Sequence, residues 1–138
     1  MEGVWDIDEN AKNNYNGTLD KNSLVFNLMI RQPDFVSEEY ANETIERVKK
    51  KKPHELLEKV KFGTIEEGTC IQMMHSGSYD SEPESFKKMA LFAEENGLKR
   101  IGHNHREIYL TDARKVAPEK LKTVLRFRSE MRQDSFHQ

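Results

Sequence analysis

Residues 103–110 read HNHREIYL, and the alternation of their side chains predicts a β-strand with two different faces. Ile108 and Leu110 share one face, and we expect this apolar face to pack against helices. The opposite face carries an imidazole, a carboxylate and a phenol, those of His105, Glu107 and Tyr109. Successive members of this set lie about 7 Å apart along a strand. They are the first candidate functional residues.

The chemistry of Glu107 depends on whether its face is covered. A second layer or a partner over this face would partly desolvate the carboxylate and raise its pKa. Such a carboxylate can attract a cationic ligand or transfer a proton. The plainer alternative is a solvated face with three unrelated polar residues, and the strand taken alone favours that alternative.

The segment 81–97 predicts a helix with both of its ends marked. Ser81 and Glu84 have the spacing of a capping box, Pro83 fits the first turn, and Asn96-Gly97 supplies a stop. Phe86, Met89, Ala90 and Ala93 form its apolar face.

The remaining segments complete an α+β pattern. Apolar patterns and turn residues predict a strand around Val4 and Trp5 that is joined by a long loop to a strand over 23–31. A helix is predicted over 36–48, with Asp34 or Ser37 as its cap. A hairpin of strands 60–66 and 69–75 and a last strand at 121–127 complete the set. This order predicts one mostly antiparallel sheet with two helices on one face. We expect a single domain over residues 1–128 and a frayed tail over 129–138.

Composition excludes several classes of protein. The chain of 138 residues has a net charge of −2, so no global charge attracts nucleic acid or an anionic membrane. Its single cysteine, Cys70, cannot form an internal disulfide, and the N-terminus lacks the pattern of a signal peptide. No window approaches the roughly 20 apolar residues of a membrane span. We therefore expect a cytoplasmic protein without nucleic-acid or membrane partners.

A second polar run, residues 75–80 (HSGSYD), lies between a predicted strand and the predicted helix 81–97. Gly77 permits a tight turn there, and Tyr79 would overhang the sheet edge. By itself the run is more typical of a connector than of a binding site.

Several segments together resemble the GyrI-like family of small-molecule-binding domains, in particular its stand-alone bacterial branch. They are EGVWD (2–6), MIRQPDFV (29–36), GTCIQMMHSGSYDSEPESF (68–86), HREIYLTDARK (105–115) and PEKLKTVLR (118–126). The resemblance implies a pseudo-symmetric α+β fold, also called SOUL-like, with a central cleft. It relates the chain to effector-binding domains of multidrug-sensing regulators, and it requires no cofactor and no metal.

The resemblance also implies residue roles. In the sensing domains a buried glutamate among aromatic rings receives lipophilic cations, and Glu107 matches that glutamate. Trp5, Tyr79 and Tyr109 match positions that could contribute to an aromatic cage, and His75 and His105 complete the expected ligand-binding set. We therefore expect a binding protein for lipophilic or cationic aromatic xenobiotics. The alternative is a hydrolase of cyclopropane-bearing DNA-alkylating toxins, with Glu107 and Tyr109 as catalytic residues.

The chain departs from the family pattern HHEIYLSDPRK at three positions, Arg106, Thr111 and Ala113. Alternation turns Arg106 away from Glu107, so we expect the pocket to be intact. The family's usual strand-helix-strand segment ahead of EGVW is also absent. Either the chain is a truncation, or a second copy supplies the absent strands in a homodimer.

Two rival sites have weaker support. His103, His105 and Glu107 are metal-ligand types on one strand face, with His75 and Cys70 elsewhere, but alternate positions splay apart. The basic run 47–52 could contact nucleic acid. It more simply matches a solvated helix C-terminus, because cations there complement the helix dipole and no aromatic residue is interleaved.

Overall fold

The computed structural model describes residues 1–13 and 21–133. The chain divides into two compact units. The first comprises Met1–Ile30 and Glu67–Gln138, and the second is Arg31–Glu66. Each unit is described by itself.

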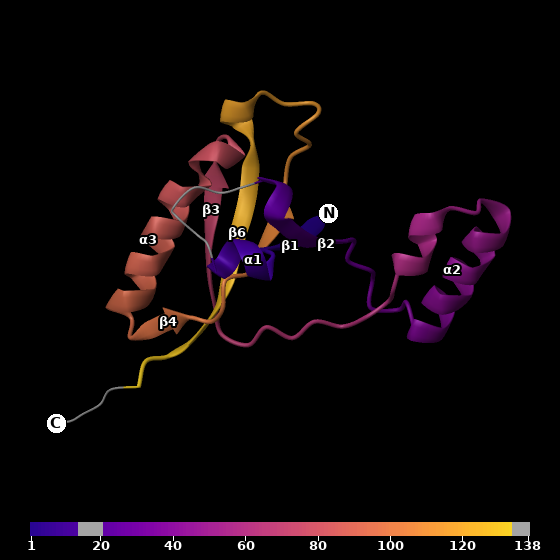
Figure 1. Ribbon diagram of the computed structural model, residues 1–138, viewed down its shortest axis with the longest axis horizontal. Helices are drawn as coiled ribbons and strands as arrows, with labels where there is room; N and C mark the ends of the chain where they lie inside the picture. Colours follow the sequence, from indigo (N-terminus) through magenta and orange to yellow (C-terminus); the bar gives the residue numbers. More distant parts are fainter. Residues whose placement is uncertain (14–20, 134–138) are drawn as a thin grey trace. The chain divides into compact units, whose positions relative to one another are not determined.

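The first unit is built on an antiparallel sheet (Figure 1). Its strands are β1 (Glu2–Ile7), β2 (Leu24–Met29), β3 (Cys70–Ser76), β4 (Leu98–Arg100), β5 (His105–Tyr109) and β6 (Lys122–Met131). The strand order is β2-β1-β5-β6-β3, and β4 pairs with the end of β6. Every neighbouring pair is antiparallel. The predicted α+β class with a mostly antiparallel sheet is confirmed.

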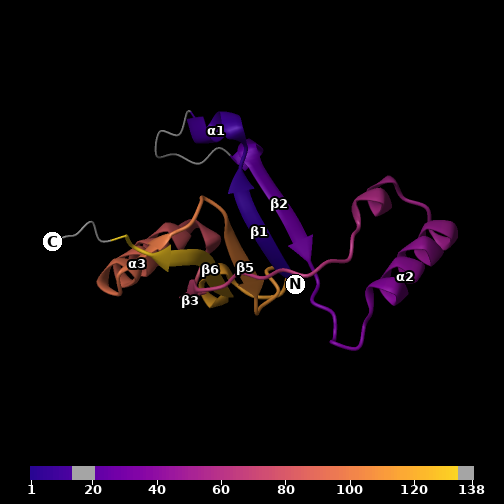
Figure 2. The same cartoon turned by 90° about the horizontal axis from the view of Figure 1, so that it is seen from below.

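The first hairpin also matches its prediction. Strands β1 and β2 pair along their whole length, with Trp5 opposite Phe26. The connection carries the short helix α1 (Glu9–Asn13), which lies at the end of the hairpin (Figure 2). The rest of the predicted loop includes residues 14–20, which lie outside the described residues.

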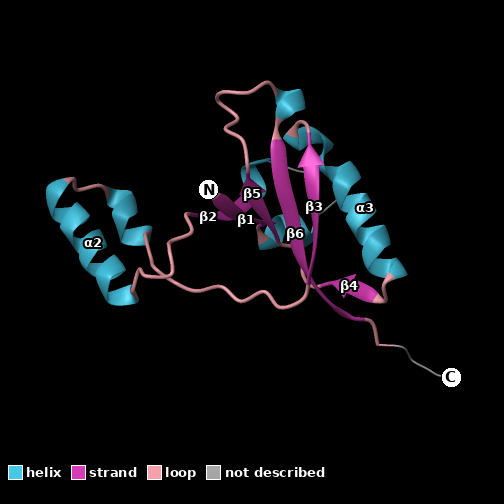
Figure 3. Cartoon of the chain, turned by 180° about the vertical axis from the view of Figure 1, so that it is seen from behind, coloured by secondary structure: helices cyan, strands magenta, loops and turns pink. Residues whose placement is uncertain are grey.

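Helix α3 (Glu82–Glu95) covers one face of this sheet, lies along β3 (Figure 3) and also contacts β4. Met89 and Ala93 are buried against a core of Ile71, Leu125 and Phe127. The helix stops as predicted, with Asn96 as its C-cap and Gly97 at a φ of +69°.

The predicted capping box at Ser81 is wrong. Ser81 holds the N-cap position, but its side chain makes no capping hydrogen bond. Its hydroxyl donates instead to the Ser78 carbonyl at 2.8 Å and lies 3.1 Å from Nε2 of His75. The 3₁₀ turn η3 (Tyr79–Ser81) runs directly into the helix, so the hydroxyl is drawn to the turn and the buried histidine rather than to the helix N-terminus.

The prediction of which face of β5 meets the helix is also wrong. Glu107 lies opposite Leu125 in the β5–β6 register, and Leu125 is fully buried. Glu107 and its neighbours at alternate positions therefore share the face that α3 covers, whereas Leu110 is 53% exposed. Alternation separated the two faces correctly, but the apolar residues of β6 decide which one the helix covers.

The second unit contains helix α2 (Glu38–Lys51) and a 3₁₀ turn, η2 (Glu55–Lys59). Ser37 caps α2 by accepting a hydrogen bond from the Tyr40 amide at 3.1 Å, so the predicted cap is confirmed for Ser37. The basic run 47–52 occupies the last turn of the helix and its C-cap, as expected. A place for α2 on the sheet face stays a prediction.

One predicted strand is absent, and the last strand is longer than predicted. Residues 60–66 form no strand, because β3 pairs instead with β6 from Cys70 to Ser76 and the chain turns at Gly68, whose φ is +66°. At the other end, β6 continues through Ser129 to Met131 because β4 pairs with it there, so the predicted tail does not begin at residue 129. Residues 134–138 of that tail lie outside the described residues.

None of the helices in the described part of the chain is long and apolar enough to cross a bilayer.

A polar contact inside the core helps to hold helix α3 to the sheet. Ser85 Oγ lies 2.7 Å from Nδ1 of His75, and both residues are buried. We expect Ser85→Ala to lower the free energy of unfolding by about 1–3 kcal/mol, because a buried ring nitrogen loses its partner. Chemical denaturation followed by Trp5 fluorescence measures this loss. The control Lys88→Ala, at an exposed position of the same helix, should change it by less than about 0.5 kcal/mol.

Candidate functional site

Side chains from β1, β5, η3 and the first turn of α3 meet on the covered face of the sheet. We call this set the aromatic–acid cluster, and its members are Trp5, Tyr79, Glu82, His105, Glu107 and Tyr109. Five of these six residues were predicted from the sequence. The first strand contributes because Trp5 lies opposite His105 in the β1–β5 register.

A chain of hydrogen bonds links the indole, the phenol and the carboxylate. Trp5 Nε1 donates to the Tyr109 hydroxyl at 2.7 Å, and that hydroxyl donates to Oε2 of Glu107 at 3.1 Å. The phenol therefore orients both of its neighbours. Burial, followed by the nearby Glu107 charge, raises the pKa of Tyr109, which stays a neutral donor.

Two carboxyl groups share the cluster, and they differ in charge. Burial and the neighbouring Glu107 carboxylate raise the pKa of Glu82 to about 9. Burial alone would also raise the pKa of Glu107, but His105, Glu82 and Tyr109 together hold it below its usual value. The raised pKa predicted for Glu107 therefore belongs to Glu82. At neutral pH Glu82 keeps its proton, and Glu107, only 6% exposed, carries the negative charge.

His105 lies between the carboxylate and the helix. Its Nε2 is 3.8 Å from Oε1 of Glu107, which is beyond hydrogen-bond distance. Its ring packs edge-on against Phe86 of α3, with centroids 4.7 Å apart. The histidine is thus positioned by an aromatic contact, and its nearest charged group is Glu107.

Aromatic rings border the carboxylate. Tyr79 meets Tyr109 edge-on at 6.3 Å, and Trp5 stacks on Phe26 at 4.6 Å. Tyr79 and Phe26 are 40% and 50% exposed, so each offers ring surface to a ligand. Burial and nearby acids raise the pKa of Tyr79, which leaves it uncharged.

His75 has a different environment from the other predicted ligand-binding residues. It lies on the same sheet face, opposite Thr123, but its Nδ1 contacts Ser85 Oγ and its Nε2 lies 2.8 Å from the Ser78 carbonyl. Both ring nitrogens are engaged inside the protein. The structure therefore gives His75 a role in joining β3, η3 and α3.

Sequence reasoning missed three residues: Glu82, Phe86 and Phe26. A signal existed for the first two, because Glu82, Phe86, Met89 and Ala93 follow helical spacing and lie on one face of α3. Glu82 is polar, so apolar periodicity alone does not mark it. Phe26 carried no such signal, because its place opposite Trp5 depends on the strand register, which the sequence pattern does not define.

The structure does not bring together the rival metal-ligand set of His103, His105 and Glu107. His103 is exposed, and its backbone carbonyl accepts a hydrogen bond from Arg100. In the described residues, the group able to hold a metal consists of Glu82, His105 and Glu107, which offer one ligand atom each within 4.8 Å of one another.

Cys70 belongs to the other face, where its thiol contacts backbone carbonyls. Burial, followed by the charge of Glu67, raises the pKa of that thiol and makes it a poor nucleophile.

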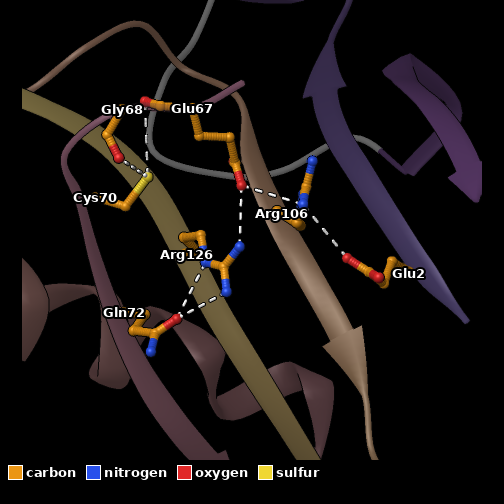
Figure 4. A network of polar contacts seen from close by, with 7 residues as sticks. All are labelled: Glu2, Glu67, Gly68, Cys70, Gln72, Arg106 and Arg126. Carbon is orange, nitrogen blue, oxygen red and sulfur yellow. Dashed lines mark hydrogen bonds and ion pairs between the residues drawn. The ribbon is translucent and has the colours of Figure 1, made fainter. Parts of the chain in front are cut away.

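The opposite face of the sheet carries a separate network of charges (Figure 4). Arg106 and Arg126 both pair with Oε1 of Glu67, at 3.1 and 3.0 Å, and Arg106 also reaches Glu2 at 3.5 Å. Arg106 therefore points away from Glu107, as predicted. The departure from the family pattern at this position leaves the aromatic–acid cluster unchanged.

Comparisons with known proteins agree with this architecture. The GyrI-like small molecule binding domain matches residues 5–128. An uncharacterized conserved protein from Listeria innocua has a crystal structure with 37% identity and a TM-score of 0.78, covering 94% of this chain and 62% of that one. A hydrolase from Listeria innocua has 36% identity and a TM-score of 0.78, covering 94% of this chain and 61% of that one.

The chain thus spans about three-fifths of the length of these two solved structures. None of the curated proteins compared with the chain matches it. The family match covers most of the sequence, and the resemblance of its motifs is confirmed. The chain belongs to the family of GyrI-like small-molecule-binding domains.

Proposed function

We propose that this domain binds lipophilic aromatic cations of the xenobiotic type at the aromatic–acid cluster. The observation that carries the proposal is the burial of the Glu107 carboxylate beside aromatic rings. Among the described residues the only ion-pair partner of this carboxylate is His105, at 3.8 Å. No lysine or arginine of the described chain neutralises it, so a ligand cation would meet a largely uncompensated charge in a site of low polarity.

The aromatic rings support the same choice of ligand. Tyr79 and Phe26 expose ring faces, while Trp5 and Tyr109 form the wall nearest to the carboxylate. Flat aromatic ligands gain area by stacking on such rings, and a positive charge gains further from the ring faces. Charge and stacking thus favour one ligand class, which is a planar cation with an apolar body.

The electrostatic part of the proposal is tested with two dyes of similar size. We expect Glu107→Gln to weaken binding of a rhodamine-like cation by about 1–3 kcal/mol, because the substitution keeps the shape and removes the charge. The affinity for a neutral dye should be almost unchanged. Quenching of Trp5 fluorescence measures both affinities.

Glu84→Gln is the matched control, since Glu84 is exposed on α3 and lies outside the cluster. It should leave both affinities unchanged. Equal losses for the two dyes in Glu107→Gln would remove the electrostatic role, and no binding of either dye by the unmodified chain would contradict the proposal.

Gly3 governs the position of the indole in this site. It lies opposite Glu107 in the β1–β5 register. A Cβ at this position would lie 2.5 Å from Trp5 Nε1 and 3.2 Å from the Tyr109 hydroxyl. Only a residue without a side chain therefore leaves room for the Trp5–Tyr109 hydrogen bond.

We expect Gly3→Ala to weaken binding of the cationic and the neutral dye alike, because the displaced indole loses its stacking position and its bond to Tyr109. An altered emission maximum of Trp5 in the free protein would report the displacement directly. Gly63→Ala is the control, because nothing lies within 4 Å of a Cβ there. A Gly3→Ala protein with unchanged emission and unchanged affinities would show that Trp5 has no part in the site.

A second candidate function is hydrolysis of a strained electrophile such as a cyclopropane-bearing DNA alkylator. It is favoured by the 36% identity to a hydrolase from Listeria innocua. In this version the ionised Glu107 would act as a general base toward water, or Tyr109 as a general acid toward the leaving group.

We expect such a compound to be converted slowly to its water adduct by the unmodified chain and at least about a hundredfold more slowly by Glu107→Gln, within the usual range for loss of a general base. Mass spectrometry of the reaction mixture measures this conversion. Binding without any conversion would leave the domain a binding protein only.

A further inference from the structure

Three atoms that can ligate a metal converge between α3 and β5. Glu82, His105 and Glu107 contribute one atom each, and all three atoms lie within 4.8 Å of one another. Glu82 Oε2 and His105 Nε2 are buried and have no hydrogen-bond partner among the described residues. Buried polar atoms without partners are unfavourable, and they are uncommon in folded proteins unless a ligand or an ion satisfies them.

We propose that Glu82, His105 and Glu107 form a binding site for a divalent transition-metal ion of the Zn²⁺ type. This inference goes beyond the binding of organic cations, because it needs the imidazole and both carboxyl groups but none of the exposed rings. One nitrogen and two oxygens are a ligand set that Zn²⁺ accepts, and three protein ligands leave a fourth position open.

The observed spacing is close to what such an ion requires. Bonds of about 2.0–2.2 Å in tetrahedral geometry separate neighbouring ligand atoms by roughly 3.4 Å. His105 Nε2 and Glu107 Oε1 are already 3.8 Å apart. Glu82 is the first residue of α3, so small side-chain rotations can bring its oxygen inward without moving the sheet.

Neighbouring side chains hold two of the ligands in place. The Tyr109 hydroxyl bonds Oε2 of Glu107, which leaves Oε1 directed toward His105. Phe86 packs against the imidazole ring and limits its rotation. Such outer contacts orient ligands and strengthen metal binding in proteins.

The charges favour a divalent ion, and the imidazole favours one that accepts nitrogen ligands. Two neighbouring carboxylates repel each other when both are ionised, and a divalent cation between them removes that repulsion. The imidazole then selects among cations, because Mg²⁺ and Ca²⁺ prefer oxygen ligands whereas Zn²⁺ and Co²⁺ accept nitrogen.

The full chain, treated with a chelator and dialysed, tests the site with Zn²⁺ and with Co²⁺ as a spectroscopic probe. We expect one Zn²⁺ per chain by calorimetry, at least tenfold tighter than Ca²⁺, and visible Co²⁺ absorption bands of a low-coordinate N/O site. Glu82→Gln and His105→Asn should each weaken Zn²⁺ binding at least tenfold. Glu84→Gln and His103→Asn are matched controls at exposed positions nearby, and they should leave the Zn²⁺ affinity unchanged.

Equal losses in the control variants, or a Co²⁺ spectrum of the unmodified chain identical to that of the hydrated ion, would overturn the proposal. The Co²⁺ spectrum needs no substitution, so it decides the question even if a variant fails to fold. Tyr79→Ala separates the two binding functions. It should weaken both dyes and leave the Zn²⁺ affinity unchanged, because Tyr79 supplies ring surface and no metal ligand.

Discussion

The packing of α3 onto β3 and β6 is the contact on which the rest of the domain depends. Met89 and Ala93 fill the space above Ile71, Leu125 and Phe127, and this apolar layer determines which face of the sheet is covered. Because β5 pairs with β6 in a register that aligns Glu107 with Leu125, the Glu107 side chain lies on the helix-covered face together with the core residues. The candidate site is thus the polar end of the hydrophobic core.

Sequence reasoning recovered the parts of this arrangement that local patterns encode. The helix of residues 81–97, the hairpin around Trp5 and the alternation in HNHREIYL each follow from short-range patterns. Alternation pointed to His105, Glu107 and Tyr109, whereas Trp5 and Tyr79 came only from the resemblance to the family. The covered face of β5 was assigned wrongly because alternation is symmetric between faces. Two other predictions were wrong for a related reason, the strand at residues 60–66 and the capping role of Ser81. Which strand pairs with which, and which acceptor a hydroxyl finds, depends on residues that are distant in the sequence.

In the two proposals above, the pair of carboxyl groups would accept positive charge in two ways. With Glu82 protonated, the cluster carries one negative charge, which suits a large monovalent ligand resting against the rings. With Glu82 ionised, two negative charges and an imidazole would present ligand atoms within 4.8 Å of one another, which suits a compact divalent ion. On these proposals, the bound ligand would decide whether the helix contributes a neutral acid or a charge.

The position of Glu82 on the first turn of α3 has an evolutionary consequence. Its distance from Glu107 is determined by how the helix lies on the sheet, and that in turn depends on the sizes of the residues packed at Met89 and Ala93. Exchanges at these two buried positions would tilt or shift the helix by fractions of an ångström while leaving every ligand-facing residue in place. Related domains with identical site residues can then differ in ligand preference, and screening libraries restricted to the site itself would overlook that source of diversity.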